Sequence, residues 1–100
     1  MRGKEKKFME FEWDEEKNTI NKVKHNISFE IAAHVFDDPE YIEMFDFEHS
    51  TNEDRYIAIG KVRDILFVVF TERKDTIRLI SARRATASER RLYYDQDIYY

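Results

Sequence analysis

Histidine and arginine are the side chains of this 100-residue chain whose types and spacing could carry out chemistry. His25 stands with several arginines and with carboxylates that could orient them: Glu30, Asp54 and Glu72. An imidazole acts as acid or base near neutral pH, and a guanidinium holds two phosphate oxygens and stabilises charge developing on them. The set therefore suits cleavage of RNA by internal transesterification, in which a 2′-hydroxyl loses a proton and the phosphorane gains charge.

Each of these residues also has a purely structural interpretation. His25 falls in the last turn of a predicted helix, where a cation complements the helix dipole. Arg73 lies in a polar turn, where it can simply be exposed. Four further arginines can pair with acidic residues 37–48 or with a partner protein: Arg83, Arg84, Arg90 and Arg91. The sequence leaves both interpretations open.

Several classes of site are excluded by composition. The sequence contains no cysteine, which excludes disulfides and thiolate metal sites. Its three histidines show no metal-ligand spacing, and its two glycines are too few for a phosphate-binding loop. We therefore predict no metal and no other cofactor. The longest apolar run, residues 65–70, is far too short to span a membrane, and no secretory signal follows the basic start. We expect a cytoplasmic protein without a membrane partner.

The net charge of −4 conceals a strong asymmetry along the chain. Residues 26–54 hold nine acidic residues and no Lys or Arg, whereas residues 55–91 hold ten Lys or Arg against four acidic residues. The potential near a phosphate depends on charges within about 8–10 Å. The second segment could therefore bind a polyanion, although both segments can equally be solvated faces of opposite sign.

Residues 65–84 are the stretch around which we expect the fold to be organised. An apolar run, a polar turn at 72–75 and a second strand at 76–84 predict a β-hairpin. The apolar run has no polar alternation, which predicts that both its faces are covered and that it lies in the middle of the sheet.

The start of the chain predicts a strand and a helical hairpin. A half-buried strand at 8–13 leads through the N-cap Asp14 into a helix that ends at His25, with Ile20 and Val23 in its buried stripe. Asn26 suits a left-handed C-cap. A second helix, capped by Ser28 and stopped before residue 39, should pack antiparallel to the first.

The remaining elements complete a small α+β domain. We predict strands at 41–47 and 55–59, the second ending near Gly60, before the central hairpin. Thr86 and Glu89 form a capping box for a last helix through Tyr93. The predicted order is β-α-α-β-β-β-β-α, with an antiparallel sheet and a helical hairpin packed on one face. A basic flexible tail at 1–7 and a tyrosine-rich tail at 95–100 flank a single domain at 8–94.

This topology predicts where the charged residues lie. If the first helix reverses the direction of the first strand, His25 lies at one end of the sheet with Arg55 and Arg73, and Arg83 and Arg84 lie at the other end, up to about 30 Å away. Side chains alternate along a strand, so Arg83 and Arg84 should face opposite sides. Arg78 should share a face with Arg84 and form a basic ladder with it.

The motifs together resemble the BrnT family of type II toxins. The resemblance is carried by residues 11–18, Asn21, and the segments 24–32 and 35–39. It continues through Asp54-Arg55, Gly60, Thr71-Glu72-Arg73, residues 80–83 and residues 87–90. These matches follow one order and cover nearly the whole chain from residue 8 to about residue 94.

The resemblance implies a RelE-like fold and a ribonuclease that blocks translation. It also implies a BrnA-like ribbon-helix-helix antitoxin, in a complex of two copies each that binds operator DNA through the antitoxin. The implied catalytic residues are His25, Arg73, Arg83 and Arg84, and the candidates for RNA binding are Lys24, Arg55, Arg78 and Arg90. The alternative is a non-catalytic module of the same fold that binds RNA or the antitoxin.

Overall fold

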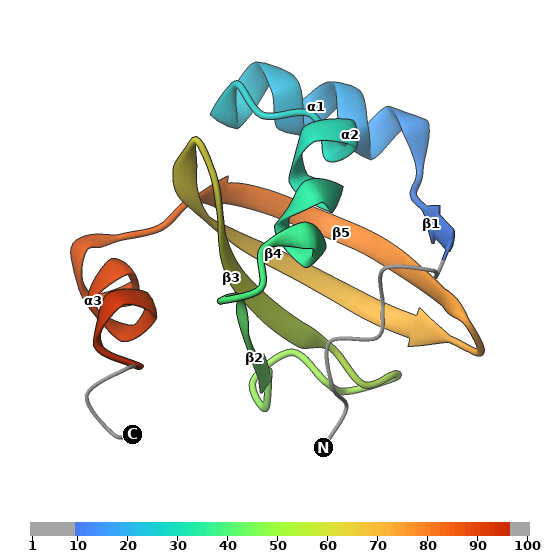
Figure 1. The fold of residues 1–100 in the computed structure, drawn as a ribbon. Helices are drawn as coiled ribbons and strands as arrows, with labels where there is room; N and C mark the ends of the chain where they lie inside the picture. The colour runs from blue at the N-terminus through green and yellow to red at the C-terminus, as the bar shows by residue number, and fades with distance from the viewer. Residues whose placement is uncertain (1–9, 97–100) are drawn as a thin grey trace.

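The computed structural model describes residues 10–96 of the chain, which form a five-stranded sheet with helices against it (Figure 1). In chain order the elements are β1 (Glu10–Glu12), α1 (Glu15–His25), α2 (Phe29–Ala32), the 3-10 helix η2 (Ala33–Asp37), β2 (Ile42–Phe45), β3 (Tyr56–Val62), β4 (Asp64–Arg73), β5 (Thr76–Arg84) and α3 (Ala87–Asp95). The predicted α+β class is confirmed. The predicted tails lie outside the described residues, except that Asp95 ends α3 and Gln96 caps it.

The strand order of the sheet is β1-β5-β4-β3-β2, so the apolar strand β4 lies in the centre, as the sequence predicts. Neighbouring strands from β2 to β5 are antiparallel. At the edge, β1 pairs with β5 in parallel, with Glu10 opposite Thr76 and Glu12 opposite Arg78. The expected antiparallel sheet is confirmed from β2 to β5 and differs only at this edge, because β1 and β5 are joined through helices and other strands and not by a hairpin.

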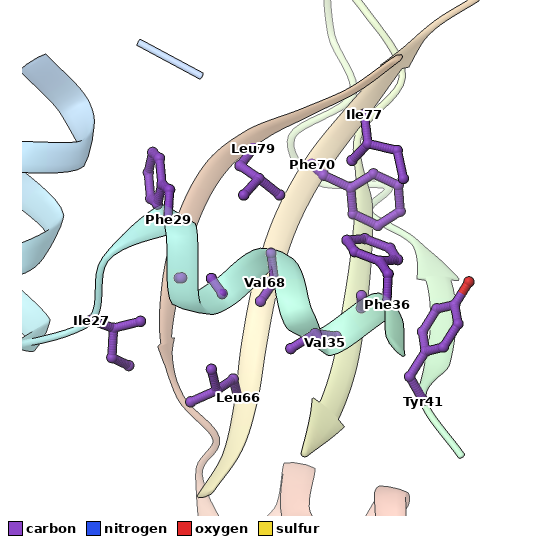
Figure 2. Close-up of a cluster of buried hydrophobic side chains, with 13 residues drawn as sticks. Ile27, Phe29, Val35, Phe36, Tyr41, Leu66, Val68, Phe70, Ile77 and Leu79 are labelled. Atoms are coloured by element: carbon purple, nitrogen blue, oxygen red, sulfur yellow. The ribbon is translucent and has the colours of Figure 1, made fainter. Parts of the chain in front are cut away.

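One face of the sheet is covered by α2 and η2, and α1 lies along the β5 edge (Figure 1). The main hydrophobic core lies between the sheet and the segment of α2 and η2 (Figure 2). Its largest fully buried side chains include Phe29, Val35, Val68, Phe70 and Leu79. We call this side the covered face.

The other face of the sheet is only partly covered. α3 packs there at one end, where Tyr93 joins Ile59 and Ile65 in a second, smaller cluster. Ile57 and Phe67 lie at the edge of this cluster and are half-buried. We call this side the open face, and it is the face on which a ligand can approach the central strands.

The predicted helix caps are confirmed. Asp14 and Ser28 accept backbone hydrogen bonds at the starts of α1 and α2, and Asn26 ends α1 with a left-handed φ of 59°. Thr86 and Glu89 form the capping box of α3. These local signals depend on only a few neighbouring residues, which is why they can be predicted without the tertiary structure.

The segment after Ser28 and the strand near Gly60 differ from expectation. The second helix is α-helical only to Ala32 and continues as the 3-10 helix η2. Gly60 lies inside β3 and does not end it. A Cβ atom at Gly60 would lie 2.8 Å from Cγ1 of Val35 and 3.0 Å from Cβ of Tyr41, so glycine is required there for the close approach of η2.

The buried side of α1 is formed by asparagines, and the predicted stripe of Ile20 and Val23 is wrong, since these side chains are 56% and 84% exposed. Asn21 Nδ2 donates to the carbonyl oxygens of Ile27 and Ala82 at 2.9 and 2.8 Å, and its Oδ1 accepts from the N–H of Ala82 at 3.2 Å. Ala82 lies in β5 beyond the end of the pairing with β1. The Asn21 amide therefore takes the hydrogen-bonding place of an edge strand.

Asn18 performs a similar role at the start of α2. Its side chain is almost fully buried, and its Oδ1 accepts from the N–H of Phe29 at 2.8 Å. Its Nδ2 donates to Oε1 of Glu30 at 2.9 Å, and this hydrogen bond lowers the pKa of Glu30. The two asparagines thus fix how the helical segment turns back over the sheet.

Replacing Asn21 with alanine should lower the free energy of unfolding by about 2–4 kcal/mol, because buried backbone groups of Ile27 and Ala82 lose their partners. Ile20→Ala is the control on the exposed side of the same helix and should change the stability by less than about 0.5 kcal/mol. Urea unfolding followed by circular dichroism measures both. An equal loss of stability in the two variants would mean that the apolar residues anchor α1.

Candidate functional site

His25 lies at the same end of the sheet as Arg84, contrary to the prediction that it joins Arg55 and Arg73. Residues later in α1 contact residues later in β5. Asn21 binds the backbone of Ala82, and Arg84 Nη1 donates to the carbonyl oxygen of His25 at 3.1 Å. The reason is that β1 pairs only with the first residues of β5. The later residues of β5 have no strand on their outer edge. α1 lies along this edge and runs in the same direction as β5.

A bulge in β5 changes which arginines share a face. Phe70 pairs with Leu79 and Val69 pairs with Ser81, so Ile80 is an extra residue in β5. An extra residue reverses the alternation of side chains beyond it. The predicted opposite orientation of Arg83 and Arg84 holds, but the predicted ladder of Arg78 and Arg84 is wrong. Arg78 shares the open face with Arg83.

The open face carries a depression with a volume of about 430 Å³. Its floor is apolar and comes from the central strands, and its rim is charged. The lining residues are Ile57, Phe67, Val69, Ile80 and Ser81 on the strands, with Asp46, Glu48, His49, Arg55 and Arg83 around them. Two of the predicted site residues, Arg55 and Arg83, are therefore brought together here.

Arg83 is held in one orientation within this depression. Its Nη1 and Nη2 donate to the two carboxylate oxygens of Glu89 at 2.9 and 3.0 Å. Its guanidinium lies 4.0 Å above the centre of the Phe67 ring, which adds a cation–π contact. The pairing raises the pKa of Arg83 and lowers the pKa of Glu89. The bidentate geometry leaves the charge of Arg83 fixed at the edge of the apolar floor.

Helix α3 supplies Glu89 and is itself fixed by Tyr93. The Tyr93 hydroxyl donates to Oδ2 of Asp38 at 2.5 Å, and burial together with this carboxylate raises the pKa of Tyr93. Asp38 follows η2 on the covered side of the sheet. The position of Arg83 thus depends on contacts that reach across the end of the sheet.

Arg55 differs from Arg83 in its contacts with acidic side chains. Among residues 10–96, no acidic side chain lies within ion-pair distance of its guanidinium. Its backbone is fixed, because its N–H donates to Ser50 Oγ at 2.8 Å and its carbonyl oxygen accepts from the N–H of Asp46 at 2.9 Å. Arg55 is therefore a positioned cation whose guanidinium has no acidic partner among residues 10–96.

The other predicted site residues lie elsewhere. Arg73 and Arg78 share Glu12, with Nη1 atoms 3.9 and 3.1 Å from its Oε2, and Arg73 also approaches Glu53 at 3.5 Å. Lys24 is exposed on α1. Arg90 is exposed on α3, in a shallow surface pocket that Tyr94 also lines. The eight residues therefore form separate groups.

Asp46 and His49 were not among the site residues predicted from the sequence, and Asp46 fell in the predicted strand at 41–47. Nδ1 of His49 lies 3.2 and 3.0 Å from Oδ1 and Oδ2 of Asp46. One signal in the sequence could have indicated the pair. His49 follows Asp46 by three residues, just before a polar turn, and this spacing allows the two side chains to meet. Nothing local showed that the turn lies beside the open face.

In the part of the chain that the structure describes, no three His, Asp or Glu side chains gather closely enough to hold a metal ion. None of the helices within residues 10–96 is long and apolar enough to cross a membrane.

The fold and the depression define a small α+β protein with fixed arginines beside an apolar floor, a class of surface suited to phosphate-bearing ligands. The family model described as "Ribonuclease toxin, BrnT, of type II toxin-antitoxin system" matches residues 13–89. The chain therefore belongs to the BrnT family of ribonuclease toxins, as the sequence motifs indicated.

A solved structure supports the same relationship. The 1.1 Å crystal structure of the Brucella abortus ribonuclease toxin BrnT is 27% identical to this chain and superposes with a TM-score of 0.54. The match covers 78% of this chain and 97% of the Brucella chain. No curated protein sequence matches the chain.

Replacing Glu89 with glutamine should reduce stability at pH 7 by about 1 kcal/mol, since the charge opposite Arg83 is lost while the capping acceptor remains. The pKa of Glu89 is lower in the folded protein, so its contribution is complete above about pH 5 and is lost as the pH falls through the folded-state pKa. Wild type and variant should therefore converge once the pH falls below the folded-state pKa of Glu89. Urea unfolding at pH 7 and across an acidic pH series measures this, and a difference that persists at the lowest pH would point to altered packing.

Proposed function

We propose that this protein is an endoribonuclease toxin that cleaves RNA without a metal ion and thereby inhibits translation. Its membership of a family of ribonuclease toxins supports the activity. The arrangement of Arg55 and Arg83 around the depression on the open face is the observation that carries the location of the site. A RelE-like fold is part of the same proposal.

The open face suits the chemistry of RNA better than the end that carries His25 and Arg84. Arg55 can hold non-bridging phosphate oxygens, and Arg83 supplies a second, fixed positive charge for the phosphorane. The apolar floor beside them gives a surface on which a base can lie, with the Phe67 ring at its edge. Arg78 extends the positive charge along the same face. Cleavage by attack of the 2′-hydroxyl needs no metal ion if side chains stabilise the charge.

A BrnA-like antitoxin with a ribbon-helix-helix domain is the proposed partner, in a complex of two copies each that binds operator DNA through the antitoxin. Membership of a type II toxin family supports an antitoxin in general. The exposed apolar side chains of Ile20, Val23 and Ile31 on the helical side offer a surface that a partner protein can cover. The open face would then be blocked only if the antitoxin reaches it.

The competing proposal is a non-catalytic module that binds RNA or the antitoxin through the same arginines. Arg83 favours it in one respect, because its guanidinium is already engaged by Glu89. The two proposals differ in whether RNA is cut, so cleavage assays on chosen variants separate them.

The purified protein should cleave RNA in excess EDTA, and Arg55→Ala should slow cleavage about 100-fold because one donor to the phosphate is lost. This variant should fold normally, since the guanidinium has no ion pair among residues 10–96. Lys17→Ala removes the same charge from exposed α1 and should stay within about twofold of wild type. Gel analysis of labelled RNA, with and without ribosomes, measures the rates. If the wild-type protein leaves RNA intact both with and without ribosomes, the proposal that it is an enzyme is wrong.

Arg83 and Arg84 provide a matched pair, because they are neighbours in sequence but lie on opposite faces. Induced without its partner, the wild-type gene should stop growth, Arg83→Ala should relieve this arrest, and Arg84→Ala should retain it. Growth curves and pull-down of the co-expressed antitoxin measure both properties. If both variants stop growth but lose the antitoxin, the arginines belong to the protein interface, and normal growth with the wild-type gene would remove the toxin proposal.

A further inference from the structure

A histidine and a carboxylate form a pair at the rim of the depression on the open face. His49 Nδ1 faces both oxygens of Asp46, at 3.2 and 3.0 Å. The side chain of Asp46 is only 11% exposed, whereas that of His49 is 62% exposed. Because an ionised carboxylate can only accept hydrogen bonds, the proton of the neutral ring belongs on Nδ1. Nε2 then presents its lone pair for a ligand.

The segment that carries this pair is fixed against Arg55, the residue that precedes β3. Ser50 Oγ donates to the carbonyl oxygen of Asp46 at 2.6 Å and accepts from the N–H of Arg55 at 2.8 Å. The N–H of Asp46 donates to the carbonyl oxygen of Arg55 at 2.9 Å. These hydrogen bonds hold the imidazole and a phosphate-binding arginine in one rigid unit.

The other two histidines of the chain lack this setting. His34 makes a similar contact with Asp37, at 2.9 Å, but Asp37 is 64% exposed and the pair lies on η2. His25 lies at the end of α1 beside Arg84. Of the three histidines, only His49 lines the depression that Arg55 and Arg83 line. A histidine–carboxylate contact is therefore common to two sites, but only one of them faces the proposed substrate.

We propose that His49 is the general base of the cleavage reaction and that Asp46 is the residue that positions it. The proposal rests on the function proposed above and adds to it a residue that accepts the proton. The charged groups that line the same depression are Asp46, Glu48, Arg55 and Arg83. Arg55 and Arg83 would hold the phosphate, while His49 acts on the neighbouring hydroxyl.

The proton balance of the step is simple. Nε2 of His49 takes the proton of the 2′-hydroxyl as its oxygen forms a bond to phosphorus. The bond between phosphorus and the 5′-oxygen breaks, and the leaving oxygen takes a proton from water. The imidazolium returns its proton to the hydroxide that remains. The products are a 2′,3′-cyclic phosphate and a 5′-hydroxyl, and no oxidant, reductant or further reactant is needed.

Single-turnover cleavage of a labelled RNA by His49→Ala tests the proposal. The rate should fall at least about 100-fold, while affinity for the same RNA with a 2′-deoxy group at the cleaved position stays within about threefold. His34→Ala is the matched control, because it removes the same kind of contact away from the depression, and it should cleave like wild type.

A chemical readout separates a proton acceptor from a structural residue. Free imidazole should restore part of the rate to His49→Ala, and one limb of the pH–rate profile of wild type should be missing in this variant. Asp46→Asn should lower the rate and respond less to imidazole, because the His49 ring is still present in this variant but is misoriented. A rate loss with no rescue, accompanied by a lower melting temperature, would overturn the proposal in favour of a structural role.

The role as base, and not acid, is tested with a 5′-bridging phosphorothiolate substrate. A thiolate leaves without a proton, so His49→Ala should remain slow on this substrate if His49 accepts the proton from the 2′-hydroxyl. Recovery of the wild-type rate would overturn the assignment as base. Cleavage at full rate by His49→Ala on ordinary RNA would overturn this inference alone, whereas intact RNA with the wild-type protein would reject the proposed function as well.

Discussion

The hydrogen bonds between Asn21 and Ala82 are the interaction on which the arrangement of the fold depends. β1 is three residues long and leaves the later part of β5, which pairs with β4 on its inner side, without a strand on its outer edge. The amide of Asn21 satisfies both backbone groups of Ala82 and also the carbonyl oxygen of Ile27. One side chain therefore completes the sheet edge, sets the direction of α1 and holds the link that turns back into α2. Because buried backbone groups must be paired, no apolar residue can replace it.

A single extra residue in β5 then divides the arginines between two surfaces. With regular alternation, Arg78 and Arg84 would share a face, but the bulge at Ile80 reverses the pattern. Arg84 consequently lies against the end of α1 and Asp64, while Arg83 reaches the open face. This separation places Arg78 and Arg83 on the open face and leaves the His25 end with a different set of contacts.

The open face combines the two charge segments of the sequence. The acidic segment contributes Asp46, and the basic segment contributes Arg55 and Arg83. The connection between β2 and β3 brings them together, because Ser50 joins Asp46 to Arg55 through backbone hydrogen bonds. In the proposed reaction, Asp46 would orient His49 beside arginines that hold the phosphate, and together they would provide both proton transfer and charge stabilisation. The apolar floor under them lowers the local dielectric and strengthens these interactions.

The sequence by itself determined the local features: the caps at Asp14, Ser28 and Thr86, the left-handed Asn26, the central strand and hairpin, and the motifs of the BrnT family. Each of these depends on neighbouring residues or on an apolar run. Only the tertiary structure decided the buried role of Asn21, the face of Arg83 and the place of His49. The physical reason is that these depend on which distant backbone groups need partners, where one extra residue shifts a strand, and which turn packs beside which strand. Hydrophobic periodicity carries no information about any of the three.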